Sequence, residues 1–225
     1  MRAEVSVLLD LLLPTRCVIC AATGDDLCDS CRAGLTRLRA PRCDRCGAPT
    51  AWPVARCKEC SGRRLAFAHA RAAVAYDDGA RLLVAAWKER GLRTLAALAA
   101  ELVCETVRRP PVYTLTFVPA DPDRRLQRGH NPAANLANEL GDRWELPAPS
   151  LLERAAGIRA QRGLPLAERR RNVRGAFRVT ERPPTKLALI DDVYTTGATV
   201  SAAATALRKA GARHVEVVTF ARAVR

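Results

Sequence analysis

The sequence is short of lysine, aromatic residues and long apolar runs. Four of its 37 basic side chains are lysines, and aromatic residues make up 4% of the chain, so few rings are present on which nucleic acid bases could stack. The apolar stretch from Val5 to Leu13 is interrupted by Asp10 and is far shorter than the roughly 20 residues of a membrane-spanning helix. It also lacks the charged start and small-residue cleavage site of a signal peptide. We therefore expect no membrane span and a cytoplasmic location.

The sequence combines a large positive net charge with the amino-acid composition of a globular protein. The 225 residues are 48% apolar, which suits one or two domains with a hydrophobic core and excludes collagen-like, coiled-coil and wholly disordered chains. The net charge is +14 and the isoelectric point is about 10.2. Such a charge predicts an anionic partner, which is a phosphate ligand, a nucleic acid or a membrane surface.

Cysteines are concentrated in the first quarter of the chain, where eight of the nine form four C-x-x-C pairs. Two such pairs supply the four thiolates of a tetrahedral Zn²⁺ site. A disulfide framework is the alternative, but pairs within single tight turns are typical of metal sites, and no secretion signal precedes them. We predict two structural zinc ions, and their ligands are Cys17, Cys20, Cys28, Cys31, Cys43, Cys46, Cys57 and Cys60.

These cysteines define a first domain over residues 1–62. The order of the pairs favours one zinc on the first two and another on the last two, although the short gap between Cys20 and Cys28 leaves an interleaved pairing open. A domain so small and weakly apolar is expected to need metal to fold. Its role is structural or, alternatively, contact with nucleic acid. With both metals bound its net charge is about −2, so the positive charge belongs to a second domain, residues 63–225, with a net +12.

The second domain alternates short apolar runs with helical patterns, which predicts an α/β fold with a parallel sheet covered on both faces. Ligands of such sheets bind at the carboxyl ends of the strands. The expected strands are Arg71–Tyr76, Val112–Val118, Lys186–Asp191 and His214–Phe220. The expected helices are Ala80–Arg90, Leu92–Arg108, Asn131–Leu140 with Asn131 as its N-cap, and Gly197–Ala210.

One strand end has the residues of a phosphate site. Asp191 and Asp192 follow four apolar residues, and a short loop then opens a helix. Free N–H groups at a helix start, hydroxyl donors and a glycine that admits close approach suit a phosphate monoester, whereas the two carboxylates suit ribose hydroxyls, directly or through Mg²⁺. The loop residues are Thr195, Thr196, Gly197, Ala198 and Thr199. An ordinary capped helix is the simpler alternative, but two adjacent aspartates after a buried run argue against it.

Residues 187–199 resemble the phosphoribosyl pyrophosphate (PRPP) motif of type I phosphoribosyltransferases. The wider chain resembles the ComF (competence protein F) family, in which two cysteine-pair units precede a phosphoribosyltransferase-like domain. Residues 118–119 with 128–131 are similar to that family's first-loop block, and residues 161–164, 168–169 and 172–177 are similar to its second. His130 departs from the aromatic residue usual there.

The resemblance implies roles for particular residues. Asp191 and Asp192 would hold the ribose hydroxyls with Mg²⁺ nearby, and the loop 195–199 would hold the 5′-phosphate. Arg128 and Gly129 would face the pyrophosphate. Lys88 is a candidate second pyrophosphate contact, or simply an exposed helix lysine.

A basic segment from Arg159 to Arg182 carries a net charge of +6. Charge runs are often only solvated surface. Type I enzymes, however, carry at this place a loop that closes over pyrophosphate, where cations stabilise the leaving group and exclude water. Arg169 and Arg170 are the residues predicted for that role, and the same arginines would suit a nucleic acid backbone.

Three functions follow from these expectations. The first is a Mg²⁺-dependent phosphoribosyltransferase, which moves ribose 5-phosphate from PRPP to an unidentified acceptor and releases pyrophosphate. The second, implied by the family resemblance, is a competence factor that binds single-stranded DNA and works with the DNA-uptake machinery. The third is a regulator that senses PRPP without turning it over.

Overall fold

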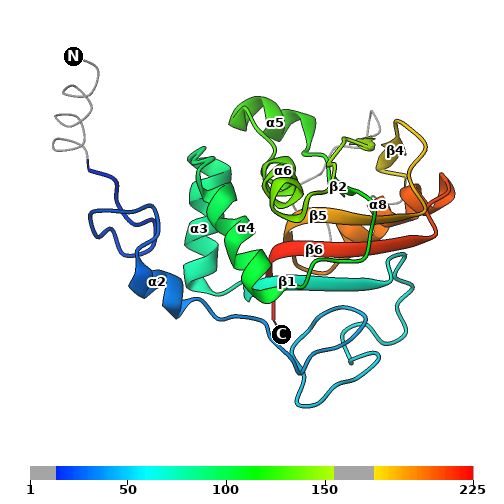
Figure 1. Ribbon diagram of the computed structural model, residues 1–225, viewed down its shortest axis with the longest axis horizontal. Coiled ribbons are helices and arrows are strands. Elements are labelled where there is room, and N and C mark those ends of the chain that lie inside the picture. Colours follow the sequence, from blue (N-terminus) through cyan, green and yellow to red (C-terminus); the bar gives the residue numbers. More distant parts are fainter. Residues whose placement is uncertain (1–13, 155–174, 225) are drawn as a thin grey trace.

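A parallel four-stranded sheet forms the centre of the computed structural model, which describes residues 14–154 and 175–224 (Figure 1). The strands are β1 (His69–Ala75), β6 (His214–Arg222), β5 (Lys186–Tyr194) and β2 (Leu115–Phe117), in that spatial order. Every neighbouring pair is parallel. The central strand β5 is completely buried from Leu187 to Ile190 because helices or other apolar elements cover both of its faces. The predicted parallel α/β architecture is confirmed.

Helices cover the two faces as the sequence pattern predicts. On one face lie α3 (Asp78–Glu89), α4 (Leu95–Thr106) and α6 (Pro132–Trp144), and on the other lies α8 (Ala198–Lys209) (Figure 1). Gly91, with a φ of +71°, lies in the turn between α3 and α4. Asn131 caps α6, since its side chain accepts a hydrogen bond from the N–H of Ala133.

Three short elements were not expected from the sequence. Helix α5 (Pro122–Arg128) follows β2, and β3 (Leu152–Arg154) pairs with β4 (Phe177–Val179) in antiparallel register. The three-residue strands show too little alternation to be recognised before their pairing is known. A further short helix that the sequence did not predict, α2 (Asp29–Gly34), belongs to the cysteine-rich region. No helix in the described residues is long and apolar enough to cross a membrane.

The chain between the two cysteine-rich units adds to the sheet. The N–H of Leu38 donates to the carbonyl oxygen of Ala73 at 2.8 Å, and the N–H of Ala75 donates to that of Thr36 at 2.8 Å. Residues 36–38 therefore cover the free edge of β1, which would otherwise present unpaired backbone groups.

The two cysteine-rich units lie at different places on the α/β domain (Figure 1). The unit around Cys17–Cys31 packs beside α3 and α4, in one apolar cluster with Leu83 and Val84. The unit around Cys43–Cys60 shares a second apolar cluster with α8 and with one face of β5 and β6. In this cluster the second unit covers part of the sheet face that α8 leaves open. The sequence-based division at residues 62 and 63 remains a prediction.

Candidate functional site

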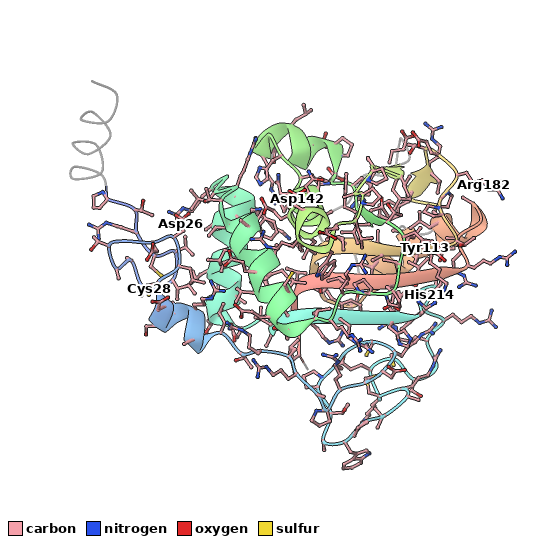
Figure 2. All side chains as sticks on the ribbon, in the orientation of Figure 1. Asp26, Cys28, Tyr113, Asp142, Arg182 and His214 are labelled. Carbon is pink, nitrogen blue, oxygen red and sulfur yellow. The ribbon has the colours of Figure 1, made fainter. Side chains whose placement is uncertain are left out.

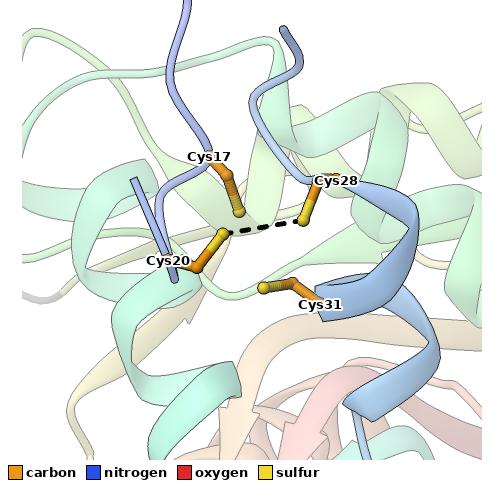
Figure 3. Close-up of side chains that lie close together, drawn as sticks. All are labelled: Cys17, Cys20, Cys28 and Cys31. Atoms are coloured by element: carbon orange, nitrogen blue, oxygen red, sulfur yellow. Dashed lines mark hydrogen bonds between the residues drawn. The ribbon is translucent and has the colours of Figure 1, made fainter. Parts of the chain in front are cut away.

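The eight paired cysteines form two clusters, and within each the sulfur atoms lie within 4.8 Å of one another. The first consists of Cys17, Cys20, Cys28 and Cys31 (Figure 3), and the second of Cys43, Cys46, Cys57 and Cys60. The first two C-x-x-C pairs thus form one cluster and the last two form the other. The interleaved pairing, which the sequence left open, does not occur.

The spacing of the sulfur atoms fits Zn²⁺. A tetrahedral ion with Zn–S bonds of about 2.3 Å separates its ligands by about 3.8 Å. The Sγ atoms of Cys20 and Cys28 are 3.7 Å apart (Figure 3), and those of Cys43 and Cys60 are 3.6 Å apart. Both clusters therefore suit structural zinc, in agreement with the prediction.

One thiol in each cluster ionises more readily than an ordinary cysteine. Burial raises the pKa of Cys17, but backbone N–H donors, Cys20 foremost, outweigh it and lower that pKa to about 6. At Cys43 burial is outweighed in the same way, chiefly by the N–H of Cys46, and the pKa falls to about 7. The thiolate is the form in which cysteine binds a metal, so each cluster offers one thiol that is readily available as a ligand.

The predicted phosphate loop connects β5 to α8. Gly197, with a φ of +70°, precedes the first residue of α8 and has no side chain with which to cap the helix. The first N–H groups of a helix have no partner within it, so those that no side chain engages can bind an anion. The hydroxyl of Thr196 accepts the N–H of Ala198 at 3.3 Å, and Thr195 is exposed. The loop thus combines a turn at Gly197 with a helix start, and its role as a phosphate cradle stays a prediction.

The two aspartates lie in the last part of β5, directly before this loop. Lys88 of α3 reaches across and its Nζ lies 2.7 Å from Oδ1 of Asp192. Burial first, and the charge of Asp192 second, raise the pKa of Asp191 to about 8, although Lys88 and Arg154 oppose the shift. Lys88 is therefore not an exposed helix lysine, since its side chain is only 22% exposed and pairs with Asp192, a predicted site residue.

The segment after β2 approaches the same region. Arg128 forms an ion pair with Glu89, the neighbour of Lys88, and the carbonyl oxygen of Gly129 accepts a hydrogen bond from Arg93 at 2.9 Å. His130 is buried, with its ring nitrogens 2.9 Å and 3.0 Å from two carbonyl oxygens. Its imidazole thus fixes the segment to the end of α3.

A cavity of about 1090 Å³ lies beside this segment. Its wall includes Pro119, Asn131 and Arg154, together with the exposed Leu126. The Nε of Arg154 donates to the carbonyl oxygen of Pro119 at 3.3 Å, and its guanidinium lies 5.2 Å from the ring centre of Phe177. Sequence reasoning did not identify Arg154 or Arg93, because their partners lie far away in the chain.

Arg169 and Arg170 lie outside the described residues. The described chain stops after Arg154 and resumes before Phe177, and these two residues are register partners in the β3–β4 pair. Arg154 also lines the cavity, so the described chain before the gap ends at the cavity wall. The role predicted for Arg169 and Arg170 stays a prediction.

A family model for the double zinc ribbon domain matches residues 8–61. The protein is 28% identical to "Competence protein F" of Haemophilus influenzae, over 92% of this chain and 97% of that protein. It is 30% identical to "DNA utilization protein YhgH" of Salmonella typhimurium, over 92% and 96%. It is 25% identical to "Competence protein ComFC" of Streptococcus pneumoniae, over 87% of each.

Two solved structures are also similar to this chain. TT1426 from Thermus thermophilus matches with a TM-score of 0.33 and 18% identity, over 61% of this chain and 84% of that one. The purine phosphoribosyltransferase of Pyrococcus horikoshii matches with a TM-score of 0.29 and 19% identity, over 56% and 80%.

The fold and the two metal clusters define a class, which is a double zinc ribbon joined to an α/β domain with a parallel sheet. The extent of the similarity to the bacterial relatives narrows the class. The chain belongs to the competence protein F (ComF) family.

Proposed function

We propose that the strand-end site binds PRPP with Mg²⁺ and transfers ribose 5-phosphate to an acceptor. The observation that carries this proposal is the order of features at the end of β5, where two carboxylates are followed within a few residues by a helix start at Gly197. The carboxylates of Asp191 and Asp192 suit the ribose hydroxyls. The loop 195–199 suits the 5′-phosphate.

In this reaction the bond between the anomeric carbon and the pyrophosphate oxygen breaks. A bond from that carbon to an acceptor nitrogen forms, and the nitrogen loses a proton. Mg²⁺ would neutralise charge on the pyrophosphate. Lys88 would act near Asp192 as a second cation, and Arg128 with the backbone of Gly129 would face the pyrophosphate. Arg169 and Arg170 would close over the departing group and exclude water.

Binding is the first test of this proposal. Calorimetry of the zinc-loaded protein should show PRPP binding that depends on Mg²⁺. Replacing both Asp191 and Asp192 by alanine should weaken it by about 100-fold or more, because each lost charge-assisted hydrogen bond contributes about 1.5–3 kcal/mol. Asp78→Ala with Asp142→Ala, which removes two exposed carboxylates elsewhere, should leave the affinity unchanged. An absence of PRPP binding by the unchanged protein contradicts the site assignment.

Turnover is the second test. Pyrophosphate release should be measured with PRPP, Mg²⁺ and a panel of amines and nucleobases. Release with one acceptor class supports the transferase. Binding without release from any acceptor favours a PRPP-sensing regulator that uses the same site.

A second candidate function is the binding of single-stranded DNA, and one surface favours it. At the amino ends of β5 and β6, opposite the phosphate loop, five exposed cations have no carboxylate within 4.0 Å in the described part of the chain. The exposed Tyr113 adjoins them, since its N–H donates to the carbonyl oxygen of Lys186 at 3.2 Å (Figure 2). The cations are Arg182, Lys186, Arg208, Lys209 and Arg213.

These cations and the ring would suit phosphates and one stacked base. The name of one relative refers to DNA utilization and the names of others to competence. Together these features support a part in DNA uptake for this chain.

Fluorescence anisotropy with a labelled oligothymidylate tests this surface. Lys186→Ala with Arg213→Ala should weaken binding and reduce the slope of log affinity against log salt by about 1.4, at about 0.7 for each lost phosphate contact on a single strand. Arg39→Ala with Arg81→Ala removes equal charge elsewhere and should leave the slope unchanged. An affinity that does not vary with salt contradicts a phosphate-backbone mode.

A further inference from the structure

Arg222, the last residue of β6, is a cation buried inside the protein at 1% exposure. A buried charge is costly unless it is paired. Its partners come from the unit around Cys43–Cys60, which is the second zinc ribbon. The guanidinium donates to the carbonyl oxygen of Cys46 at 2.8 Å and to the carboxylate of Glu59 at 2.7 Å. It also lies 3.7 Å from the sulfur of Cys46, a zinc ligand in the second cluster. The end of the last strand is thus fixed to the second metal cluster.

The same guanidinium supports the residue that leads into the phosphate loop. The Cζ atom of Arg222 lies 4.5 Å from the centre of the Tyr194 ring, within the range of a cation–π contact. Phe67 packs edge-on against that ring, with 6.3 Å between centres. The ring lies directly beneath the loop, since a Cβ added to Gly197 would overlap the Tyr194 hydroxyl. The loop therefore rests on Tyr194, and Tyr194 rests on Arg222.

A second connection joins the same ribbon to the loop. Arg63 follows the last cysteine of the ribbon, and its N–H donates to the carbonyl oxygen of Cys60 at 3.2 Å. Its side chain donates to the carbonyl oxygen of Thr196 at 2.6 Å. The N–H of Ala66 donates to the hydroxyl of Ser201, in the first turn of α8, at 3.3 Å. Both the loop and the start of α8 are therefore held from the ribbon side.

The first ribbon makes different contacts in the described residues. Its Asp26 accepts a hydrogen bond from Thr94 at 2.7 Å, and Arg32 pairs with glutamates of α4. In the described residues, none of its hydrogen bonds or ion pairs reaches residues 194–201. The two ribbons thus contact separate parts of the molecule.

We propose that the second zinc ribbon holds the phosphate loop in its binding conformation, with Arg222 and Tyr194 as positioning residues. The proposal rests on the proposed phosphate site and adds a dependence of that site on the metal of the second cluster. Zinc coordination fixes Cys46 and the chain up to Arg63. These in turn fix Arg222, Tyr194 and the carbonyl of Thr196. The zinc is then a remote determinant of phosphate affinity although it touches no substrate.

Two measurements on Tyr194 variants test this chain of contacts. Ribose 5-phosphate is the probe for calorimetry, because it engages the phosphate loop without pyrophosphate. Amide hydrogen exchange over residues 195–201 reports the loop without any ligand. Tyr194→Leu should keep both zinc ions by metal analysis, weaken ribose 5-phosphate binding by about tenfold and speed exchange in the loop. Tyr194→Phe keeps the ring, so it should show the ribose 5-phosphate affinity and the loop exchange rate of the unchanged protein.

Arg222→Met should have the same effect as Tyr194→Leu, whereas Thr94→Ala, which breaks a contact of the first ribbon, should alter neither measurement.

Unchanged affinity and unchanged loop exchange in a folded Tyr194→Leu protein with two zinc ions overturns the proposal. If the buried variants do not fold, Arg63→Ala decides in the same way, since it removes a partly exposed side chain and one hydrogen bond to the loop. Faster loop exchange in the variants, together with no sugar phosphate binding by the unchanged protein, overturns the proposed function while the positioning role stands.

Discussion

The two zinc ribbons share a cysteine pattern but occupy different environments. In the first, Cys20 is exposed and Cys28 and Cys31 are partly exposed, whereas in the second Cys43 and Cys60 are completely buried. Two C-x-x-C pairs thus build a more exposed metal site in the first ribbon and a more buried one in the second, although Cys17 is buried and Cys57 is partly exposed. The pattern predicts the metal. The surface on which each ribbon packs determines what the metal supports.

The largest effect should come from removing one metal at a time. Cys57→Ser with Cys60→Ser should lower the melting temperature by about 12 °C, or about 4 kcal/mol, because the buried cluster and the sheet share one core. Cys28→Ser with Cys31→Ser should lower it by less than half as much. Metal analysis should find one zinc in each variant. Equal losses of stability would contradict the distinction between the two ribbons.

Glycine substitutions provide a smaller and local comparison. Gly47, in the second ribbon, has a φ of +72°, and an added Cβ would overlap the carbonyl oxygen of Ala70 on β1. Gly47→Ala should therefore cost about 2–3 kcal/mol in free energy of unfolding. Gly34, in α2 of the first ribbon, has open space around it, so Gly34→Ala should be neutral or slightly stabilising. Urea titration of both variants measures the difference, and a tolerated Gly47→Ala would place the ribbon farther from β1.

The smallest effect concerns the ion pairs of the first ribbon. Arg32→Ala removes partly exposed pairs with Glu101 and Glu105, and should cost about 0.5–1 kcal/mol. The hydrogen bond from Arg32 holds the pKa of Glu105 below its usual value. The stabilisation is therefore present above the usual pKa and is lost as the pH falls through the lowered one. Melting curves of the two proteins should differ at about pH 7 and converge toward about pH 3. A difference that persists in acid would contradict an ionic origin.

The sequence was sufficient for the local features of the fold and the site. The C-x-x-C pairs identify the zinc ligands, apolar runs identify the strands, and Asn131 and Gly197 mark the starts of α6 and α8. The order of metal pairing was open, because the gap after Cys20 is too short to decide it. Only the folded chain shows which sulfur atoms meet.

The contacts that the sequence did not reveal join residues far apart in the chain. Lys88 meets Asp192 across 104 positions, and Arg222 meets Cys46 across 176. Neither residue type nor local spacing carries a signal for such pairs. The strands β3 and β4 were missed for a related reason, since each is three residues long and is defined by its partner rather than by its own pattern.

The pairing of β1 with β6 has a consequence for how the chain reaches this structure. Residues 69–75 find their partners only at residues 216–222, so the sheet is built from contacts of long sequence separation, which form slowly. The ribbons are closed by short loops and can form early around their metal. A newly made chain would then hold β1 against a preformed zinc unit, with residues 36–38 protecting its edge, until the last strand is synthesised and docks. Zinc supply during synthesis would on this account limit the yield of folded protein.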